Sequence, residues 1–292
     1  MPAVRDLWSR IPVPIRALVL GLLAAAAGTY PWAWLAGTNL RVLPSVPWGP
    51  AVMAVYLWLY WRYATGRGWP ASTSVARRDH ARVRPVDGSV WPLALVAGIV
   101  GLWCSVSLLR LIGRFVAISS PATGDVARLS PLTLLAFALM GALVAGVAEE
   151  IGFRGYMQRP LEQRYGPVAA ILIVGVVFGL AHGSHTYWTL ALMPYYLAVA
   201  AVYGALAYLT NSIIPSLVLH AGGDALDALM SLGGGGSVVQ QAAAPHAGVG
   251  AGTAVAINLV VLAATGLASI WACRELAKAT HRPFTPAARA VT

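Results

Sequence analysis

Apolar runs of about 20 residues recur along the whole chain, and each is long enough to cross a lipid bilayer as a helix. Hydrophobic residues make up 58% of the 292 residues and charged residues only 10%, against about a quarter charged in a typical soluble domain. We therefore predict an all-α fold, a polytopic membrane helical bundle of about eight transmembrane helices. The predicted spans cover approximately residues 17–37, 47–65, 91–112, 131–152, 167–187, 188–209, 212–230 and 251–272.

The net charge of +10 follows the positive-inside rule if both termini are cytoplasmic. This pattern predicts a multi-pass protein of the cell (inner) membrane and argues against nucleic acid as a partner, since the basic residues are spread over membrane-flanking segments. Four basic residues fall in segments predicted on the non-cytoplasmic side of the membrane, namely Arg41, Arg110, Arg114 and Arg128. The remaining sixteen are Arg5, Arg10, Arg16, Arg62, Arg67, Arg77, Arg78, Arg82, Arg84, Arg154, Arg159, Arg164, Arg274, Lys278, Arg282 and Arg289.

The chain divides into blocks of different composition. Residues 1–115 hold three predicted spans without an acidic residue inside them, and their largest loop, 66–90, is Arg-rich. We interpret this loop as a cytoplasmic segment that fixes topology and contacts anionic lipid head groups. Residues 131–230 contain the intramembrane carboxylates and histidines, and residues 251–292 form a last span with a basic cytoplasmic tail. Any chemistry is therefore expected in 131–230.

Two adjacent carboxylates, Glu149 and Glu150, end the apolar run 131–148, and Arg154 follows. A carboxylate at hydrocarbon depth costs roughly 2.5–3.5 kcal/mol on insertion scales, so the pair needs a function or a partner. Glu150 and Arg154 are four residues apart and can form an ion pair on one helix face. Glu149 is rotated away from that face by about 100°. One carboxylate can thus be neutralised while the other acts as a base.

Two histidines lie in later apolar segments, each with a partner four residues away. Phe178 and His182 share one helix face, so that the aromatic ring backs the imidazole, and His220 and Asp224 share a face of another helix. The glycine pair 222–223 would let a substrate or another backbone approach closely. Three helices thus supply carboxylate and imidazole groups.

Other polar and aromatic residues nearby have simpler interpretations. We interpret His185 as a residue of the membrane rim and Asp227 as structural rather than catalytic. Trp188, Tyr195 and Tyr196 are expected to be interfacial anchors or packing residues.

This set of groups suits the activation of water. A carboxylate in apolar surroundings takes up a proton more readily and works better as a general base, while a histidine can donate to a developing oxyanion. The same groups could instead hold a divalent metal such as zinc, with Glu149, His182, His220 and Asp224 as candidate ligands. The zinc-protease spacing H-E-x-x-H is absent, and no serine or cysteine lies in a nucleophile context. The expected reaction is hydrolysis by activated water.

Three motifs occur in order on separate apolar segments. Residues 149–154 match E-E-x-x-x-R, residues 178–182 match F-x-x-x-H, and residues 220–224 match H-x-x-x-N/D. The ordered trio resembles the CPBP family of intramembrane proteases, which includes the type II prenyl-protein endopeptidases that trim CAAX proteins. The resemblance covers about 131–230 and implies an intramembrane endopeptidase.

The resemblance also implies roles for the motif residues. Glu149 and His182 would activate the water, and Glu150 and Arg154 would support that site. Phe178 would back His182.

The third motif would bind the oxyanion or complete the polar cluster through His220 and Asp224. CAAX-processing eukaryotic members usually have asparagine at the latter position. An anionic aspartate cannot donate a hydrogen bond to an oxyanion unless it is protonated. Since family members have been described both as metalloproteases and as glutamate-dependent proteases, a metal stays an open alternative.

We predict hydrolysis of membrane-embedded or membrane-adjacent proteins in a water-filled cavity between the fourth, fifth and seventh spans. Straight helices with the predicted limits would separate Glu149 from His182 by much of the bilayer. The cluster therefore requires the fourth span to continue past residue 154, with some helix tilted, broken or shifted. The alternatives are a proton or cation transporter, whose relays use the same groups, and a catalytically inactive membrane scaffold or immunity protein.

Overall fold

The computed structural model describes residues 8, 10–118, 129–184, 190–243 and 250–284. The described residues form helices and connecting turns with no strand, which confirms the predicted all-α fold. Five helices are long and apolar enough to cross a membrane, and a shorter apolar helix spans Pro167–Ala181. Each of the eight predicted spans overlaps one helix in the described part of the chain.

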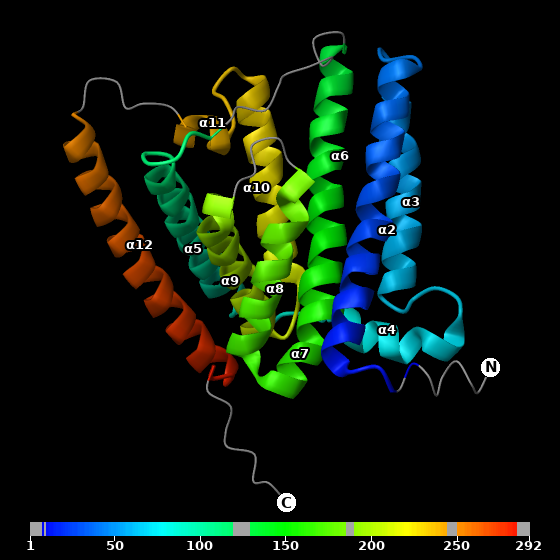
Figure 1. Ribbon diagram of the computed structural model, residues 1–292. Helices are drawn as coiled ribbons and strands as arrows, with labels where there is room; N and C mark the ends of the chain where they lie inside the picture. Colours follow the sequence, from blue (N-terminus) through cyan, green and yellow to red (C-terminus); the bar gives the residue numbers. More distant parts are fainter. Residues whose placement is uncertain (1–7, 9, 119–128, 185–189, 244–249, 285–292) are drawn as a thin grey trace, which may run out of the picture.

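The bundle has one long central helix with further helices on both sides of it (Figure 1). α2 and α3 pack on one side of α6, whereas α10, α8, α9, α5 and α12 follow on the other. The principal helices are α2 (Val13–Arg41), α3 (Trp48–Ala64), α4 (Ser74–Ala81), α5 (Trp91–Ile112), α6 (Pro131–Glu149), α7 (Gln158–Tyr165), α8 (Pro167–Ala181), α9 (Met193–Thr210), α10 (Ile214–Leu232) and α12 (Ala251–Thr280). The shorter helical segments are η1 (Ala71–Thr73), η3 (Glu150–Met157), η4 (His182–Ser184), η5 (Leu190–Leu192) and α11 (Val238–Ala243).

Helix starts and ends follow local sequence signals. Proline occupies the first turn of α5, α6, α8, α9 and α10, where its missing N–H costs nothing. The Ser130 hydroxyl also accepts a hydrogen bond from the Thr133 N–H at 3.2 Å and caps α6. Gly166 adopts a positive φ of 82° between α7 and α8, which lets the chain reverse direction there.

The predicted end of the fourth span at residue 152 is wrong. α6 continues through the π-helix η3 into α7, so that one helical segment runs from Pro131 to Tyr165. The last part, Gln158–Tyr165, is polar and is therefore invisible to a search for apolar runs. The extension past residue 154 is the condition that the predicted cluster required.

Small residues let α6 approach its neighbours closely. An added Cβ at Gly146 would lie 2.7 Å from the Ala221 Cβ of α10, and one at Gly152 would lie 2.7 Å from the Gly21 carbonyl of α2. Such contacts are typical of packed membrane helices. The first contact brings α10 against the end of α6 that carries the glutamates.

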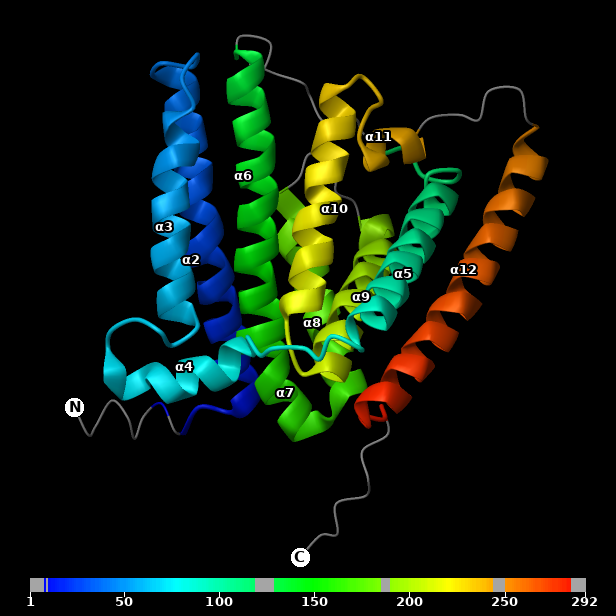
Figure 2. The same ribbon diagram turned by 180° about the vertical axis from the view of Figure 1, so that it is seen from behind.

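The start of α2 and the end of α12 lie at one end of the bundle, where α4 runs across the other helices (Figure 2). This agrees with the prediction that both termini face the same side. The terminal residues 1–7 and 285–292 themselves lie outside the described residues. The cytoplasmic orientation stays a prediction.

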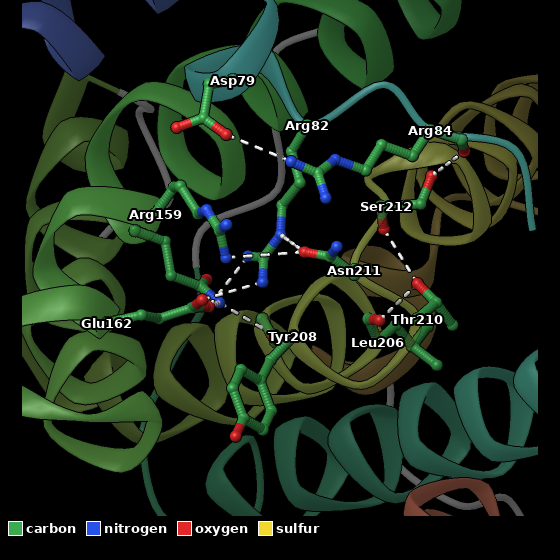
Figure 3. A network of polar contacts seen from close by, with 12 residues as sticks. Asp79, Arg82, Arg84, Arg159, Glu162, Leu206, Tyr208, Thr210, Asn211 and Ser212 are labelled. Carbon is green, nitrogen blue, oxygen red and sulfur yellow. Dashed lines mark hydrogen bonds and ion pairs between the residues drawn. The ribbon is translucent and has the colours of Figure 1, made fainter. Parts of the chain in front are cut away.

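The Arg-rich loop is attached to the helical core by buried polar contacts, which its interpretation as a topology-fixing loop at the lipid head groups did not include (Figure 3). Arg82 has a positive φ of 57° and a buried side chain that donates two hydrogen bonds to Glu162 of α7, at 2.9 and 2.8 Å. Its backbone carbonyl accepts from the Ile213 N–H at 3.1 Å. Burial lowers the pKa of Arg82, and the charge and hydrogen bonds of Glu162 oppose that shift. We call this group of contacts the Arg82 network.

Candidate active site

Three of the predicted carboxylates and His220 converge on the contact between α6, η3 and α10. The His220 Nδ1 lies 2.9 Å from the Glu150 Oε1, and its Nε2 lies 3.8 Å from the Glu149 Oε2 and 3.6 Å from the Asp224 Oδ2. The imidazole of His220 therefore joins all three carboxylates. The predicted proximity of residues 149 and 220 is confirmed, as is the side-by-side placement of His220 and Asp224.

The two glutamates differ in their surroundings. Glu150 has no exposed side-chain surface, and its Oε1 lies 3.4 Å from the Arg154 Nη1 and accepts from the His220 ring. The side chain of Glu149 is 17% exposed. Glu150 is thus neutralised inside the protein, whereas Glu149 faces a more accessible space. The predicted ion pair between residues 150 and 154 is present.

The backbone that carries these glutamates departs from an α-helix. Residues Glu150–Met157 form a π-helix, in which hydrogen bonds span five residues instead of four. The spacing argument assumed a regular α-helix across this stretch, and that assumption is wrong here. Such π segments are frequent at functional sites because the wider turn re-aims side chains.

Arg154 occupies a pocket of aromatic rings. Its Cζ lies 4.7 Å from the ring centre of Phe178, 5.2 Å from that of Tyr203 and 5.9 Å from that of Phe153. Its three guanidinium nitrogens are buried, and none has a hydrogen-bond acceptor in the described part of the chain. Cation–π attraction and the single carboxylate of Glu150 therefore stabilise the charge.

His182 joins the cluster through the aromatic rings. The Phe178 ring centre lies 4.4 Å from that of His182, which confirms their predicted shared face, and the Tyr196 ring centre is 4.7 Å from His182 on another side. The His182 Nδ1 lies 2.7 Å from the Phe178 carbonyl oxygen and donates to it, which makes Nε2 the acceptor nitrogen. The ring thus has a fixed orientation and tautomer.

The height of His182 in the bundle follows from the antiparallel pairing of α7 with α8. Glu150 lies about 15 residues before the turn at Gly166, and His182 lies about 15 residues after it. Helices of equal rise place residues at equal distances from such a turn at the same level. The turn at Gly166 therefore brings His182 back toward the level of the glutamates.

The site is open on the side of α10. An added Cβ at Gly222 or Gly223 would meet no atom within 4 Å, and both residues are exposed. The Asp224 side chain is 47% exposed next to them. A substrate backbone can therefore approach His220 and Asp224 from this side, as the glycine pair indicates.

Two tyrosines of α9 pack on the site histidines, and the sequence singled out Tyr196 but not Tyr203. Tyr203 of α9 stacks on His220 with ring centres 4.8 Å apart and planes inclined by 14°. Tyr196 is 4% exposed and packs on His182, so it is a packing residue and not an interfacial anchor. The aromatic rings of α9 carry no sequence signal that separates them from ordinary core residues.

The predictions for the other polar and aromatic residues near the site have different outcomes. Asp227 accepts a hydrogen bond at 2.6 Å from the Val238 N–H at the start of α11, which confirms a structural role. His185 and Trp188 lie outside the described residues.

The positions of the nitrogen and oxygen donor side chains decide whether this site can hold a metal ion. Among the described residues, no group of three or more His, Cys, Asp or Glu side chains could hold a metal ion. The Glu150 carboxylate is already engaged by Arg154 and His220. The described donors as placed do not fit a zinc ion, and metal dependence stays a prediction.

Comparison with known proteins identifies the same region. Residues 131–226 match the family model described as type II CAAX prenyl endopeptidase, Rce1-like. The match covers roughly a third of the chain. No curated protein and no solved structure matches the chain. The resemblance to CAAX-processing intramembrane proteases, predicted from three motifs, is confirmed.

Proposed function

Because residues 131–226 match a type II CAAX prenyl endopeptidase model, we propose that the chain is an intramembrane endopeptidase in which Glu149 is the general base. One observation carries the assignment. Glu149 and Glu150 both contact His220, but only Glu150 is fully buried and paired with Arg154. Of the two glutamates, only Glu149 has a side chain with an exposed part, 17%, along which a water and a peptide can approach.

In the proposed reaction, Glu149 accepts a proton from a water molecule, and the resulting hydroxide attacks the carbonyl carbon of the scissile peptide bond. The carbon–oxygen π bond becomes an oxyanion. The proton then passes from Glu149 to the leaving nitrogen as the carbon–nitrogen bond breaks. The products are a new carboxyl terminus and a new amino terminus, with one water consumed.

His220 has the placement of an oxyanion donor. Its Nδ1–H donates to Glu150, so Nε2 points to the space between Glu149 and Asp224. A proton on Nε2 would be shared with these carboxylates before substrate binds and would be available to the oxyanion afterwards. Glu150 and Tyr203 act as positioning residues, since they fix the imidazole by a hydrogen bond and by stacking.

His182 is proposed to orient the attacking water. Its Nδ1 donates to the Phe178 carbonyl, which makes Nε2 the acceptor nitrogen of the neutral ring, the type of atom that can accept a water proton. Phe178 lies beneath both His182 and Arg154 and holds the two motifs together. The substrate class is a membrane-embedded or membrane-adjacent protein.

The test compares membrane proteomes of cells that carry the wild type or Glu149→Gln. We expect new protein N-termini that depend on the wild type and fall by about 10²–10⁴-fold in the variant, the usual contribution of general acid–base catalysis. Glu275→Gln is a matched control, since Glu275 lies on α12 and pairs with Lys278 at 2.7 Å. Identical N-termini in wild type and Glu149→Gln would contradict a protease and favour the transport or scaffold alternatives.

A second arm treats the purified protein with a zinc chelator. We expect cleavage to persist, because the described side chains do not converge on a metal ion. Loss of cleavage on chelation, and its return with zinc, would assign the site to the metalloprotease alternative.

A further inference from the structure

A cavity lies on the other side of η3 from the candidate active site. Its volume is about 1070 Å³, and it is lined by α2, α3, α4, η3 and α7. Tyr156 of η3 lines it and donates a hydrogen bond to the Ala64 carbonyl of α3 at 2.7 Å, whereas Glu150 of the same segment faces His220 of α10. No residue of the candidate active site lines this cavity.

The cavity is apolar at one end and basic at the other. Leu23 of α2 and Leu59 of α3 line the apolar part and are 61% and 52% exposed, so this part opens on the membrane-facing surface of the two helices. Arg16 lines the basic part near α4, and Ala27 lines the far end. Eleven residues of helix separate these two, a rise of about 16 Å.

Among the described residues, the basic end has cationic side chains and no matching acid. Arg16, Arg77, His80 and Arg164 line it, and the described lining contains no Asp or Glu. The acids on the adjoining elements are already paired, Asp79 with Arg84 at 3.1 Å and Glu162 with Arg82 at 2.8 Å.

Within the described chain, Arg77 is the clearest case of a buried positive charge without a carboxylate partner. It is 6% exposed and its guanidinium donates to the carbonyls of Tyr63, Gly68 and Pro70 and to the Thr73 hydroxyl. These acceptors satisfy its hydrogen bonds but are all neutral, and no carboxylate within ion-pair distance is present in the described part of the chain. A buried cation without a counter-charge is costly, and an anion in the cavity would offset that cost.

Arg16 provides an independent indication. Its Nε is buried and has no hydrogen-bond acceptor among the described residues. A buried, unsatisfied N–H costs about 1–3 kcal/mol, more when the group is charged. Arg16 and Arg164 belong to α2 and α7, so an anion between them would be held by two different helices.

We propose that this cavity binds an anionic phospholipid of the leaflet at the α4 end. The phosphate lies beside Arg16 and Arg164 with the charge of Arg77 behind it, and an acyl chain runs along α2 and α3 toward Ala27. A small soluble phosphate would match the basic end but would leave the apolar length unfilled. A neutral amphiphile would fill the apolar length but would leave the arginines without an anion.

The test uses the full-length protein purified in detergent, with phosphatidylglycerol or phosphatidylcholine added and lipid retention measured by native mass spectrometry. We expect retention of phosphatidylglycerol about tenfold above phosphatidylcholine, lost in Arg16→Gln/Arg164→Gln, in keeping with the strength of charge-assisted hydrogen bonds. Arg78→Gln is the matched control, because Arg78 lies on α4 beside Arg77, is exposed, and bonds Ser74 instead of lining the cavity. Arg77→Gln is avoided, since loss of its four hydrogen bonds could unfold the loop.

Excess glycerol 3-phosphate distinguishes a lipid from a soluble phosphate, and we expect it not to displace phosphatidylglycerol. The proposal is overturned if both lipids are retained equally, if the double variant retains phosphatidylglycerol like the wild type, if Arg78→Gln loses it equally, or if glycerol 3-phosphate displaces it. Because the measured quantity is bound lipid, the outcome does not depend on whether the protein is a protease.

Discussion

The described part of the chain contains two buried arginine–glutamate pairs, which differ in how completely they are hydrogen-bonded. In the Arg82 network, the guanidinium makes two short bonds to Glu162, which also accepts from the Gln158 amide at 2.6 Å. In the candidate active site, the closest approach of Arg154 to Glu150 is 3.4 Å, and the guanidinium otherwise meets aromatic rings.

The difference separates a structural pair from a functional one. A fully satisfied pair fixes two segments in one geometry. A loosely bonded pair keeps a carboxylate in place while its second partner, here His220, remains available for another contact. Substitutions in the two pairs and at Asp224 should therefore separate effects on stability from effects on cleavage.

The largest expected effect is on stability, in Arg82→Met. Removing one partner of a buried ion pair typically costs 3–5 kcal/mol, so we expect a loss of about that size in the free energy of unfolding. Detergent-based thermal unfolding measures it. Arg82→Met/Glu162→Leu should recover much of the loss, since both charges are then gone. If Arg82→Met unfolds like the wild type, the Arg82 network is not a structural pair.

The next effect is on activity, in Glu150→Gln. The amide keeps the shape but removes the charge that faces Arg154 and orients His220, and we expect cleavage to fall about 10²-fold or more. The buried Arg154 then loses its carboxylate partner, so stability also falls, and the cleavage rate is expressed per folded molecule. The comparison fails if Glu150→Gln lowers stability as strongly as Arg82→Met while leaving the cleavage rate per folded molecule unchanged.

A smaller effect is expected in Arg154→Lys. Lysine keeps the charge but loses the planar contact with Phe178 and Tyr203, and a desolvated cation–π contact is worth about 2 kcal/mol. We expect roughly tenfold slower cleavage, with the substrate concentration for half-maximal rate little changed. Arg82→Lys serves as the counterpart, and its effect should appear in the unfolding temperature instead.

The smallest effect is expected in Asp224→Asn. The side chain is 47% exposed and contacts His220 at 3.6 Å, and an amide of equal size can donate to an oxyanion where an ionised aspartate cannot. We expect the cleavage rate to stay within about threefold of the wild type or to rise, because this position contributes only one solvent-accessible contact. A loss as large as in Glu149→Gln would make Asp224 an essential group.

The local features of the site could be predicted from the sequence, because partners four residues apart on a helix must share a face. This holds for Phe178 with His182 and for His220 with Asp224. The predicted span 91–112 has the limits of α5, because the apolar run begins next to Pro92 and ends before Gly113.

Contacts between distant segments could not be predicted in the same way. Arg82 and Glu162 are 80 residues apart, and each looks like an ordinary charge in a polar stretch. The amino-acid composition of Glu150–Met157 does not distinguish a π-helix from an α-helix. The stacking of Tyr203 on His220 depends on how α9 and α10 pack against each other. These features arise from tertiary packing, which overrides local preference.

The equal lengths of the two arms beside Gly166 restrict how this protein can diverge. One residue gained or lost in α7 alone would slide the α8 arm by about 1.5 Å and turn it by about 100° relative to the glutamates. His182 would then face a different neighbour. Insertions and deletions near this hairpin should therefore survive in related sequences only as matched pairs, one on each side of the turn, and such paired indels would mark chains that have kept the same catalytic alignment.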